Sequence, residues 1–146
     1  MARITRWISI SERCAMLYRM QAFKNIDLLP SQHMYIYYLC NHSDGINQDM
    51  LAKKVYVNKS SVARSIKTLE EAGYVKRVVN EEDKRAYKVY PTSKAFEVLP
   101  FIKDVMGKFN EELVNGLTEE EAKMLETLLA KVATNAANYI DKNYEE

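Results

Sequence analysis

The sequence predicts a mainly α-helical protein that carries one small β-hairpin, and three observations lead to this fold class. Segments 47–55 and 58–73 place apolar residues at helical spacing, and each begins with an asparagine, a residue favoured at helix N-caps. Segment 74–90 mixes β-branched, aromatic and charged residues around a polar centre, as a hairpin does. The rest of the chain has mainly helical periodicity. A short helix, a turn, a longer helix and a hairpin predict a winged helix-turn-helix, an α+β fold with six helices.

The first half of the chain is expected to hold four of these helices. The first spans about residues 4–23, and a break at 28–31 separates it from a second helix that ends near His42. Ser31 is the expected N-cap of the second helix, because its hydroxyl can accept a hydrogen bond from a free N–H group of the first turn. After a turn at 43–45, Asn47 caps the third helix and Asn58 caps the fourth.

The fourth helix and the hairpin have clear boundaries in the sequence. Val62, Ile66 and Leu69 form a buried stripe, and Gly73 supplies the left-handed residue that ends the helix. Strands at 75–79 and 86–90 are expected to flank a polar tip at 80–84. The fifth helix then begins at Thr92 or Ser93 and ends before Gly116, and a capping box of Thr118 and Glu121 begins a sixth helix that ends near residue 144.

Composition restricts the classes of function. The chain has 146 residues, of which 47% are hydrophobic, which suits one domain with a dimerisation extension. No stretch approaches the about 20 apolar residues of a membrane span, and the basic N-terminus does not have the pattern of a signal peptide. The two cysteines fit neither a disulfide framework nor a zinc site. We therefore expect a cytoplasmic protein without a cofactor or metal. It has no phosphate loop, nucleophile elbow or metal-ligand cluster, so we do not expect an enzyme.

Charge is distributed unevenly along the chain. Residues 53–88 contain ten lysines and arginines and five acids, which gives a local charge of +5. Residues 111–146 contain nine acids and three lysines, which gives −6. Because a polyanion needs only a local basic patch, this distribution favours double-stranded DNA as the partner of the helix-turn-helix.

The fourth helix is the expected recognition helix, since the second helix of a helix-turn-helix enters the major groove. Arg64 lies off the buried stripe and is the best candidate for a bidentate contact to guanine. Lys59, Ser61 and Lys67 are expected to contact phosphates, and Gln48 and Lys53 to contact the DNA backbone from the preceding helix. The full set of expected DNA contacts is Gln48, Lys53, Lys59, Ser60, Ser61, Arg64, Ser65, Lys67, Arg77, Asp83, Lys84 and Arg85.

The terminal helices are longer than a winged helix requires. The last one carries a stripe formed by Ala122, Leu125, Leu129, Val132, Ala136 and Tyr139 or Ile140. A chain that reads DNA with one short helix gains specificity as a two-fold dimer, so we expect these helices to form a homodimer. The expected organisation is dimerisation helices at 1–28 and 116–146, a DNA-binding lobe at 29–92 and a connecting helix at 93–115.

Motifs along nearly the whole chain resemble those of the MarR-type winged-helix transcription regulators. Residues 69–73 match the family's Leu-Glu-x-x-Gly, and Arg77 follows four residues later. Residues 83–85 match its Asp-x-Arg, and residues 51–52 match its Leu-Ala pair. In the closing Val-x-Leu-Thr-x-x-Gly stretch, Val89 and Thr92 match, whereas Pro91 and Ala95 depart from the pattern. The resemblance implies a transcription regulator, and we expect a repressor.

In this family the arginine at the wing tip enters the minor groove, and Arg85 matches that position. Residues two apart in a hairpin face the same side, so Asp83 can pair with Arg85, or with Arg77 across the strands. A narrow minor groove has an enhanced negative potential that attracts arginine. The alternative is an exposed ion pair that contributes little.

Two kinds of switch are open. MarR-like proteins often bind small phenolic or other aromatic ligands between the dimerisation helices and the DNA-binding lobe. Such a cleft could be lined by Trp7, Tyr18, Met20, Met34, Tyr35, Tyr38, Phe96 and Met106, although a stripe of this kind is more often core.

The second kind is a redox switch. Residues 14–18 resemble the Cys-x-x-Leu-Tyr stretch of the family's organic-hydroperoxide sensors, which makes Cys14 a candidate. Leu28 stands about where those sensors have another tyrosine, and a lone cysteine on a helix is usually a small core residue. A third alternative, a winged helix used only for contact with another protein, is opposed by the basic recognition helix and hairpin tip.

Overall fold

The computed structural model describes residues 3–144, in which six helices and three strands are found. Contacts within the chain divide it into two units, one ending at Phe109 and one beginning at Asn110. The elements in order are α1 (Ile4–Ala22), α2 (His33–Asn41), β1 (Ile46–Asn47), α3 (Gln48–Val55), α4 (Lys59–Glu71), β2 (Val75–Val79), β3 (Tyr87–Pro91), α5 (Ser93–Leu113) and α6 (Glu119–Tyr144). The predicted mainly helical winged-helix fold is confirmed.

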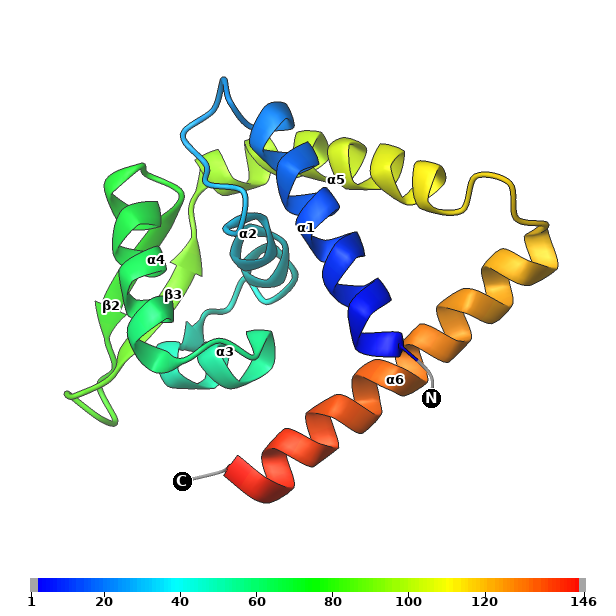
Figure 1. The fold of residues 1–146 in the computed structure, drawn as a ribbon. Helices are drawn as coiled ribbons and strands as arrows, with labels where there is room; N and C mark the ends of the chain where they lie inside the picture. Colours follow the sequence, from blue (N-terminus) through cyan, green and yellow to red (C-terminus); the bar gives the residue numbers. More distant parts are fainter. Residues whose placement is uncertain (1–2, 145–146) are drawn as a thin grey trace. The chain divides into compact units, whose positions relative to one another are not determined.

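Helix α4 packs into the core of the first unit through the predicted stripe. Val62, Ile66 and Leu69 are fully buried and meet apolar residues of α2, α3 and the sheet. Gly73 has φ +85° and ends the helix in the left-handed conformation, as predicted. Figure 1 shows α4 beside the β2–β3 hairpin, which it contacts through β2.

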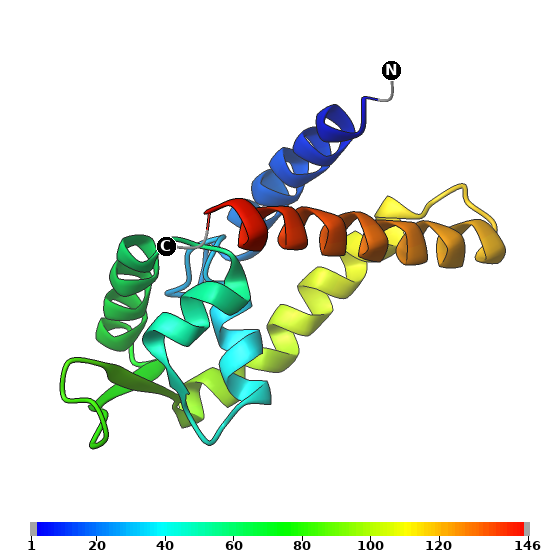
Figure 2. The same ribbon diagram turned by 90° about the horizontal axis from the view of Figure 1, so that it is seen from below.

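The hairpin of β2 and β3, here called the wing, belongs to a three-stranded antiparallel sheet with the order β1-β3-β2. Strand β1 has only two residues, which pair with Lys88 and Val89, and it is too short to leave a periodic signal in the sequence. Strand β3 begins one residue later than predicted, because Ala86 closes the wing loop (residues 80–86). The Ala86 N–H donates to the Asp83 carbonyl, and the Ala86 carbonyl accepts from Asn80 N–H, each at 3.0 Å. Figure 2 shows this loop projecting beyond the helices of its unit.

One predicted cap is wrong. Helix α2 begins at His33, two residues after the expected cap Ser31, and its N-cap residue Gln32 makes no side-chain capping bond. Residues 30–32 form a turn instead, in which Gln32 N–H bonds the Leu29 carbonyl at 2.9 Å. The Gln32 side chain also accepts a 2.9 Å bond from Leu29 N–H, and Ser31 lies within this turn instead of at the N-cap. Asn47 and Asn58 do cap α3 and α4.

The second unit consists of the end of α5 and helix α6. Thr118 and Glu121 form the predicted capping box, with bonds of 3.1 Å and 2.9 Å between each backbone N–H and the other side chain. None of the described residues of α6 is buried, and Leu128 and Leu129 are 50% and 48% exposed. Pro100 is accommodated inside α5, whose assignment is continuous from Ser93 to Leu113. No helix among residues 3–144 is both long and apolar enough to cross a membrane.

The turn before β1 gives a prediction for stability. Gly45 has φ +86°, and a Cβ built on it would lie 2.5 Å from Tyr90 Cε1. Gly45→Ala therefore combines backbone strain with a clash against a ring, and we expect it to lower the free energy of unfolding by about 2–4 kcal/mol in urea denaturation. Gly116→Ala is the matched control, because it has φ +87° with nothing within 4 Å, and only the strain of about 1 kcal/mol should remain. Equal losses for the two variants would show that the contact with Tyr90 relaxes freely.

Candidate nucleic-acid interface

The solvent side of α4 carries exposed polar and basic groups at its N-terminal end. The Asn58 side chain accepts bonds from Ser61 N–H at 2.9 Å and from the Ser60 hydroxyl at 2.8 Å, which fixes the first turn. Arg64 is exposed, and its Nη2 donates to the Ser61 hydroxyl at 3.1 Å. Lys59, Ser60 and Lys67 are also exposed. The helix thus has one buried face and one exposed face that carries polar and basic groups.

Ser65 differs from these residues. It is half-buried and forms a hydrogen bond with Tyr35 of α2. Burial raises the pKa of Tyr35, and that bond opposes the increase. The hydroxyl of Ser65 is therefore engaged within the unit.

Helix α3 presents a second, smaller set of predicted contacts. Asn47 fixes its first turn by accepting bonds from Asp49 N–H at 2.9 Å and Met50 N–H at 3.3 Å. Lys53 is exposed, whereas Gln48 is half-buried and its Oε1 has no hydrogen-bond partner among the described residues. Lys59 lies 3.9 Å from Asp49, so the N-terminal ends of α3 and α4 approach each other.

The wing loop holds its two basic side chains in solvent. Asp83 Oδ1 accepts a 3.0 Å bond from Arg85 N–H, and Asn80 Oδ1 accepts a 3.1 Å bond from Glu82 N–H. Lys84 and Arg85 are exposed, and no acceptor within residues 3–144 engages the Arg85 guanidinium. Asp83 therefore shapes the loop through the backbone and leaves the Arg85 side chain free.

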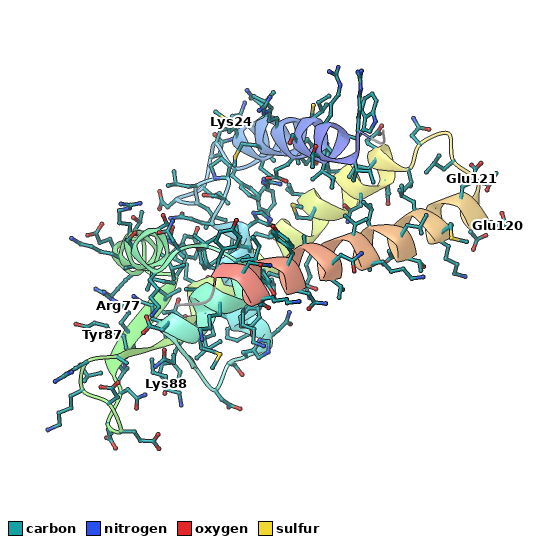
Figure 3. The ribbon with its side chains drawn as sticks, turned by 60° about the horizontal axis from the view of Figure 1, so that its bottom comes forward. Lys24, Arg77, Tyr87, Lys88, Glu120 and Glu121 are labelled. Atoms are coloured by element: carbon teal, nitrogen blue, oxygen red, sulfur yellow. The ribbon has the colours of Figure 1, made fainter. Side chains whose placement is uncertain are left out.

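Of the two partners expected for Asp83, Arg77 is wrong, because Arg77 binds Glu70. The Arg77 Nε and Nη2 donate to Glu70 Oε1 at 3.2 Å and 3.0 Å, and Arg77 N–H donates to Glu70 Oε2 at 3.0 Å. The guanidinium also lies over the Tyr87 ring, 4.9 Å from its centroid (Figure 3). Glu70 was missed by sequence reasoning, although it lies in the motif that ends α4.

The hydrogen bonds that Glu70 accepts from the side chain and from the backbone N–H of Arg77 lower the pKa of Glu70. A carboxyl with a lowered native pKa stabilises the fold above its unfolded pKa, and this contribution is lost as pH falls. We expect Glu70→Gln to lower the urea midpoint at pH 7. The midpoints of the variant and of wild type should converge as the pH falls below 4.5, the ordinary pKa of this carboxyl. Glu71→Gln, one residue later and exposed, should show no such convergence. A difference between Glu70→Gln and wild type that stays constant with pH would contradict this assignment.

The start of α5 holds the end of α4 in place. The Thr92 hydroxyl bonds the Gly73 carbonyl at 2.6 Å, and Lys94 Nζ bonds the Ala72 carbonyl at 2.5 Å. Lys94 Nζ also lies 3.6 Å from Asp27 and 4.4 Å from the Tyr74 ring centroid. These contacts join segments that are far apart in sequence, and the local pattern contained no signal for them beyond the Thr92 match.

The residues expected to line a ligand cleft fall into two groups. Tyr18, Met34, Tyr35, Tyr38 and Met106 belong to the core of the first unit or pack against it. Trp7, Met20 and Phe96 are 60%, 53% and 45% exposed. The side chains therefore do not share one environment.

The cysteines also differ from each other. Cys14 is exposed on α1, while Cys40 on α2 is half-buried, and burial raises its pKa. The nearby Tyr18 hydroxyl donates to the Val105 carbonyl at 3.0 Å, and the Tyr18 ring stacks on Phe109. The hydroxyl of Tyr18 is thus bound to α5.

Comparisons with known proteins cover this whole arrangement. A model of the MarR family matches residues 26–86. An uncharacterised HTH-type transcriptional regulator of Bacillus subtilis strain 168, YybA, is 31% identical over 123 residues, which are 84% of this chain and 79% of the relative. An uncharacterised SlyA-like transcription regulator of Listeria monocytogenes has TM-score 0.91 and 28% identity, with 100% of this chain and 99% of that chain covered. A second Listeria monocytogenes protein, assigned to the MarR family of transcriptional regulators and complexed with a 26-mer DNA, has TM-score 0.87, 28% identity and the same coverage.

Proposed function

Since the chain belongs to the MarR family of transcriptional regulators, we propose that it is a cytoplasmic homodimeric repressor that binds a pseudo-palindromic operator and is released by a small aromatic ligand. The observation that carries the proposal is the pair of exposed arginines, Arg64 on the solvent face of α4 and Arg85 on the wing loop. In this reading α4 enters the major groove and Arg85 enters the adjacent minor groove. The Listeria protein complexed with a 26-mer DNA supports DNA as the partner.

The homodimer is proposed from the exposed apolar side chains of the terminal helices. Leu125, Leu129 and Ile140 of α6 are 37%, 48% and 46% exposed, and Trp7 and Ile8 of α1 are 60% and 42% exposed. Apolar surface on this scale commonly marks an association site, and a second copy would cover it with the same helices. Two recognition helices would then meet half-sites about 34–36 Å apart.

Release by a ligand follows from this spacing. A small change in the dimer frame moves both recognition helices relative to successive major grooves, and affinity falls because only one can then be seated. The ligand is expected to be aromatic, because partly buried aromatic and methionine side chains of α1, α2 and α5, such as Tyr18, Tyr38 and Met106, pack against the core. A redox switch at Cys14 is the competing form of regulation.

A salt titration of binding to the intergenic DNA upstream of the chain's own gene tests the proposal, with a scrambled duplex of equal composition as control. We expect tight, salt-sensitive binding to the natural DNA and weaker binding to the scrambled one. Equal, weak binding to both would favour a winged helix that contacts proteins. Adding peroxide separates the switches, since loss of binding in wild type but not in Cys14→Ser would assign release to oxidation.

A further inference from the structure

The link between Glu70 and Arg77 joins the two parts of the proposed DNA interface. Glu70 lies in the last turn of α4, and Arg77 lies in the middle of β2, so the contact spans from the recognition helix to the wing. Both carboxylate oxygens are used, one by the guanidinium and one by the backbone N–H of Arg77. The position of the strand itself is therefore fixed, in addition to that of the side chain.

The sheet topology explains why this N–H is available. In the order β1-β3-β2, strand β2 is at an edge, and donors on its outer side have no partner strand. Glu70 satisfies one of them. Arg77 also pairs in register with Val89 of β3, and its guanidinium lies over Tyr87, two residues before Val89. Arg77 therefore connects Glu70 to β3, the strand that follows the wing loop, through strand pairing and through the Tyr87 ring.

The covalent connection between α4 and β2 contains Gly73, whose φ of +85° marks a turn. Such a turn sets the direction in which the chain leaves α4, and the base of the hairpin is anchored where β3 pairs with β1 and Val89 is buried. The Thr92 and Lys94 contacts hold the base of the connection, whereas Glu70 holds β2 nearer the wing loop. Arg85, at the far end of the hairpin, amplifies any rotation at its base.

We propose that Glu70 is a positioning residue that fixes the wing relative to the recognition helix, so that Arg85 and α4 reach their adjacent grooves together. This inference rests on the proposed DNA-binding function. Glu70 carries negative charge and would repel phosphates, so a loss of affinity on neutralising it requires a geometric cause. If the ion pair contributed only to stability, neutralising Glu70 would leave the position of Arg85 and the affinity for DNA unchanged.

A double-mutant cycle of Glu70→Gln and Arg85→Ala tests the coupling, at one salt concentration and on the operator found for wild type. We expect Arg85→Ala to weaken binding about thirtyfold and Glu70→Gln about tenfold. If Glu70 acts through Arg85, the double variant should also bind about thirtyfold more weakly than wild type. Independent contributions would multiply to about 300-fold and overturn the proposal.

Glu71→Gln is the matched control, because it removes the same charge from the neighbouring exposed position. Its affinity should equal or exceed that of wild type, and a tenfold loss there would also overturn the proposal. Footprinting gives the second readout. Glu70→Gln should lose hydroxyl-radical protection in the flanking minor grooves and retain protection of guanine N7 in the major groove.

Folding is checked by urea denaturation of every variant. If Glu70→Gln does not fold, Glu70→Asp replaces it, since the shorter side chain keeps the charge but cannot reach both donors, and the same cycle applies. Failure of the proposed function looks different from failure of this inference. If the proposed function is wrong, wild type itself does not select any DNA. If only this inference is wrong, wild type binds selectively, but the losses of affinity from Glu70→Gln and Arg85→Ala multiply in the double variant.

Discussion

Replacing Arg85 with alanine is expected to weaken operator binding by about thirtyfold or more, because a dimer loses one minor-groove contact in each half-site and each is worth about 1–3 kcal/mol. The guanidinium has no acceptor within residues 3–144, and the wing loop is held by backbone N–H groups that donate to the Asn80 and Asp83 side chains. The loop should therefore keep its shape in the variant. Electrophoretic mobility shift with the selected operator measures the loss, and sedimentation confirms an unchanged oligomeric state.

Lys84→Ala is the comparison for Arg85→Ala, since it removes the same charge from the next residue of the wing loop. We expect a smaller loss that is uniform across DNA sequences and reduces the salt dependence by about one counterion per contact. Arg85→Lys should bind at an intermediate level, because it keeps the charge without the planar guanidinium. Unchanged affinity of Arg85→Ala, or a loss equal to that of Lys84→Ala, would contradict the assignment of Arg85 to the minor groove.

Placing a charge in the apolar stripe of α6 is expected to produce a monomer. Leu129 is 48% exposed in the chain, so Leu129→Glu should leave the helix intact while burying an unpaired carboxylate in a dimer. Such a group costs about 3–5 kcal/mol, and a two-fold interface would contain it twice. We expect sedimentation at micromolar concentration to show monomers, and operator affinity to fall to that of a single half-site.

Thr134→Glu is the control on the polar side of α6. Thr134 is exposed, and its hydroxyl donates to the Ala130 carbonyl of its own helix at 2.9 Å. This variant should remain dimeric and bind the operator as wild type does. If Leu129→Glu stays dimeric at the same concentrations, the dimer interface lies elsewhere and the proposed role of α6 is wrong.

The elements that the sequence predicted well are those that local interactions determine. Helix caps are one example: Asn47, Asn58 and the Thr118–Glu121 box bond N–H groups within three residues. The left-handed turn at residue 73 is another, because it needs only a glycine at that position. The stripe on α4 follows from helical spacing alone. Ser31 is not the cap because it lies within a turn, stabilised by the Gln32 side chain, after which the helix begins at His33.

The site was less predictable where contacts cross between elements. Arg85 and Arg77 were the two partners expected for Asp83. The wing loop turns Asp83 toward Arg85 N–H, while the end of α4 brings Glu70 to Arg77. The seven-residue separation of Glu70 and Arg77 in the sequence does not indicate that β2 folds back against the end of α4. Periodicity also could not separate core from cleft, since Tyr35 is 2% exposed and Trp7 is 60% exposed with the same expected role.

Selection of bound sequences from a random double-stranded DNA library tests the central claim most directly. The account predicts enrichment of two inverted half-sites with centres about 10–10.5 base pairs apart, flanked by A·T-rich positions where the wings enter the minor groove. Repeating the selection with Arg85→Ala should weaken the preference in the flanks and leave the inner half-sites unchanged. Recovery of a single half-site, or of no preferred sequence, would contradict the account of a dimer that reads a pseudo-palindrome.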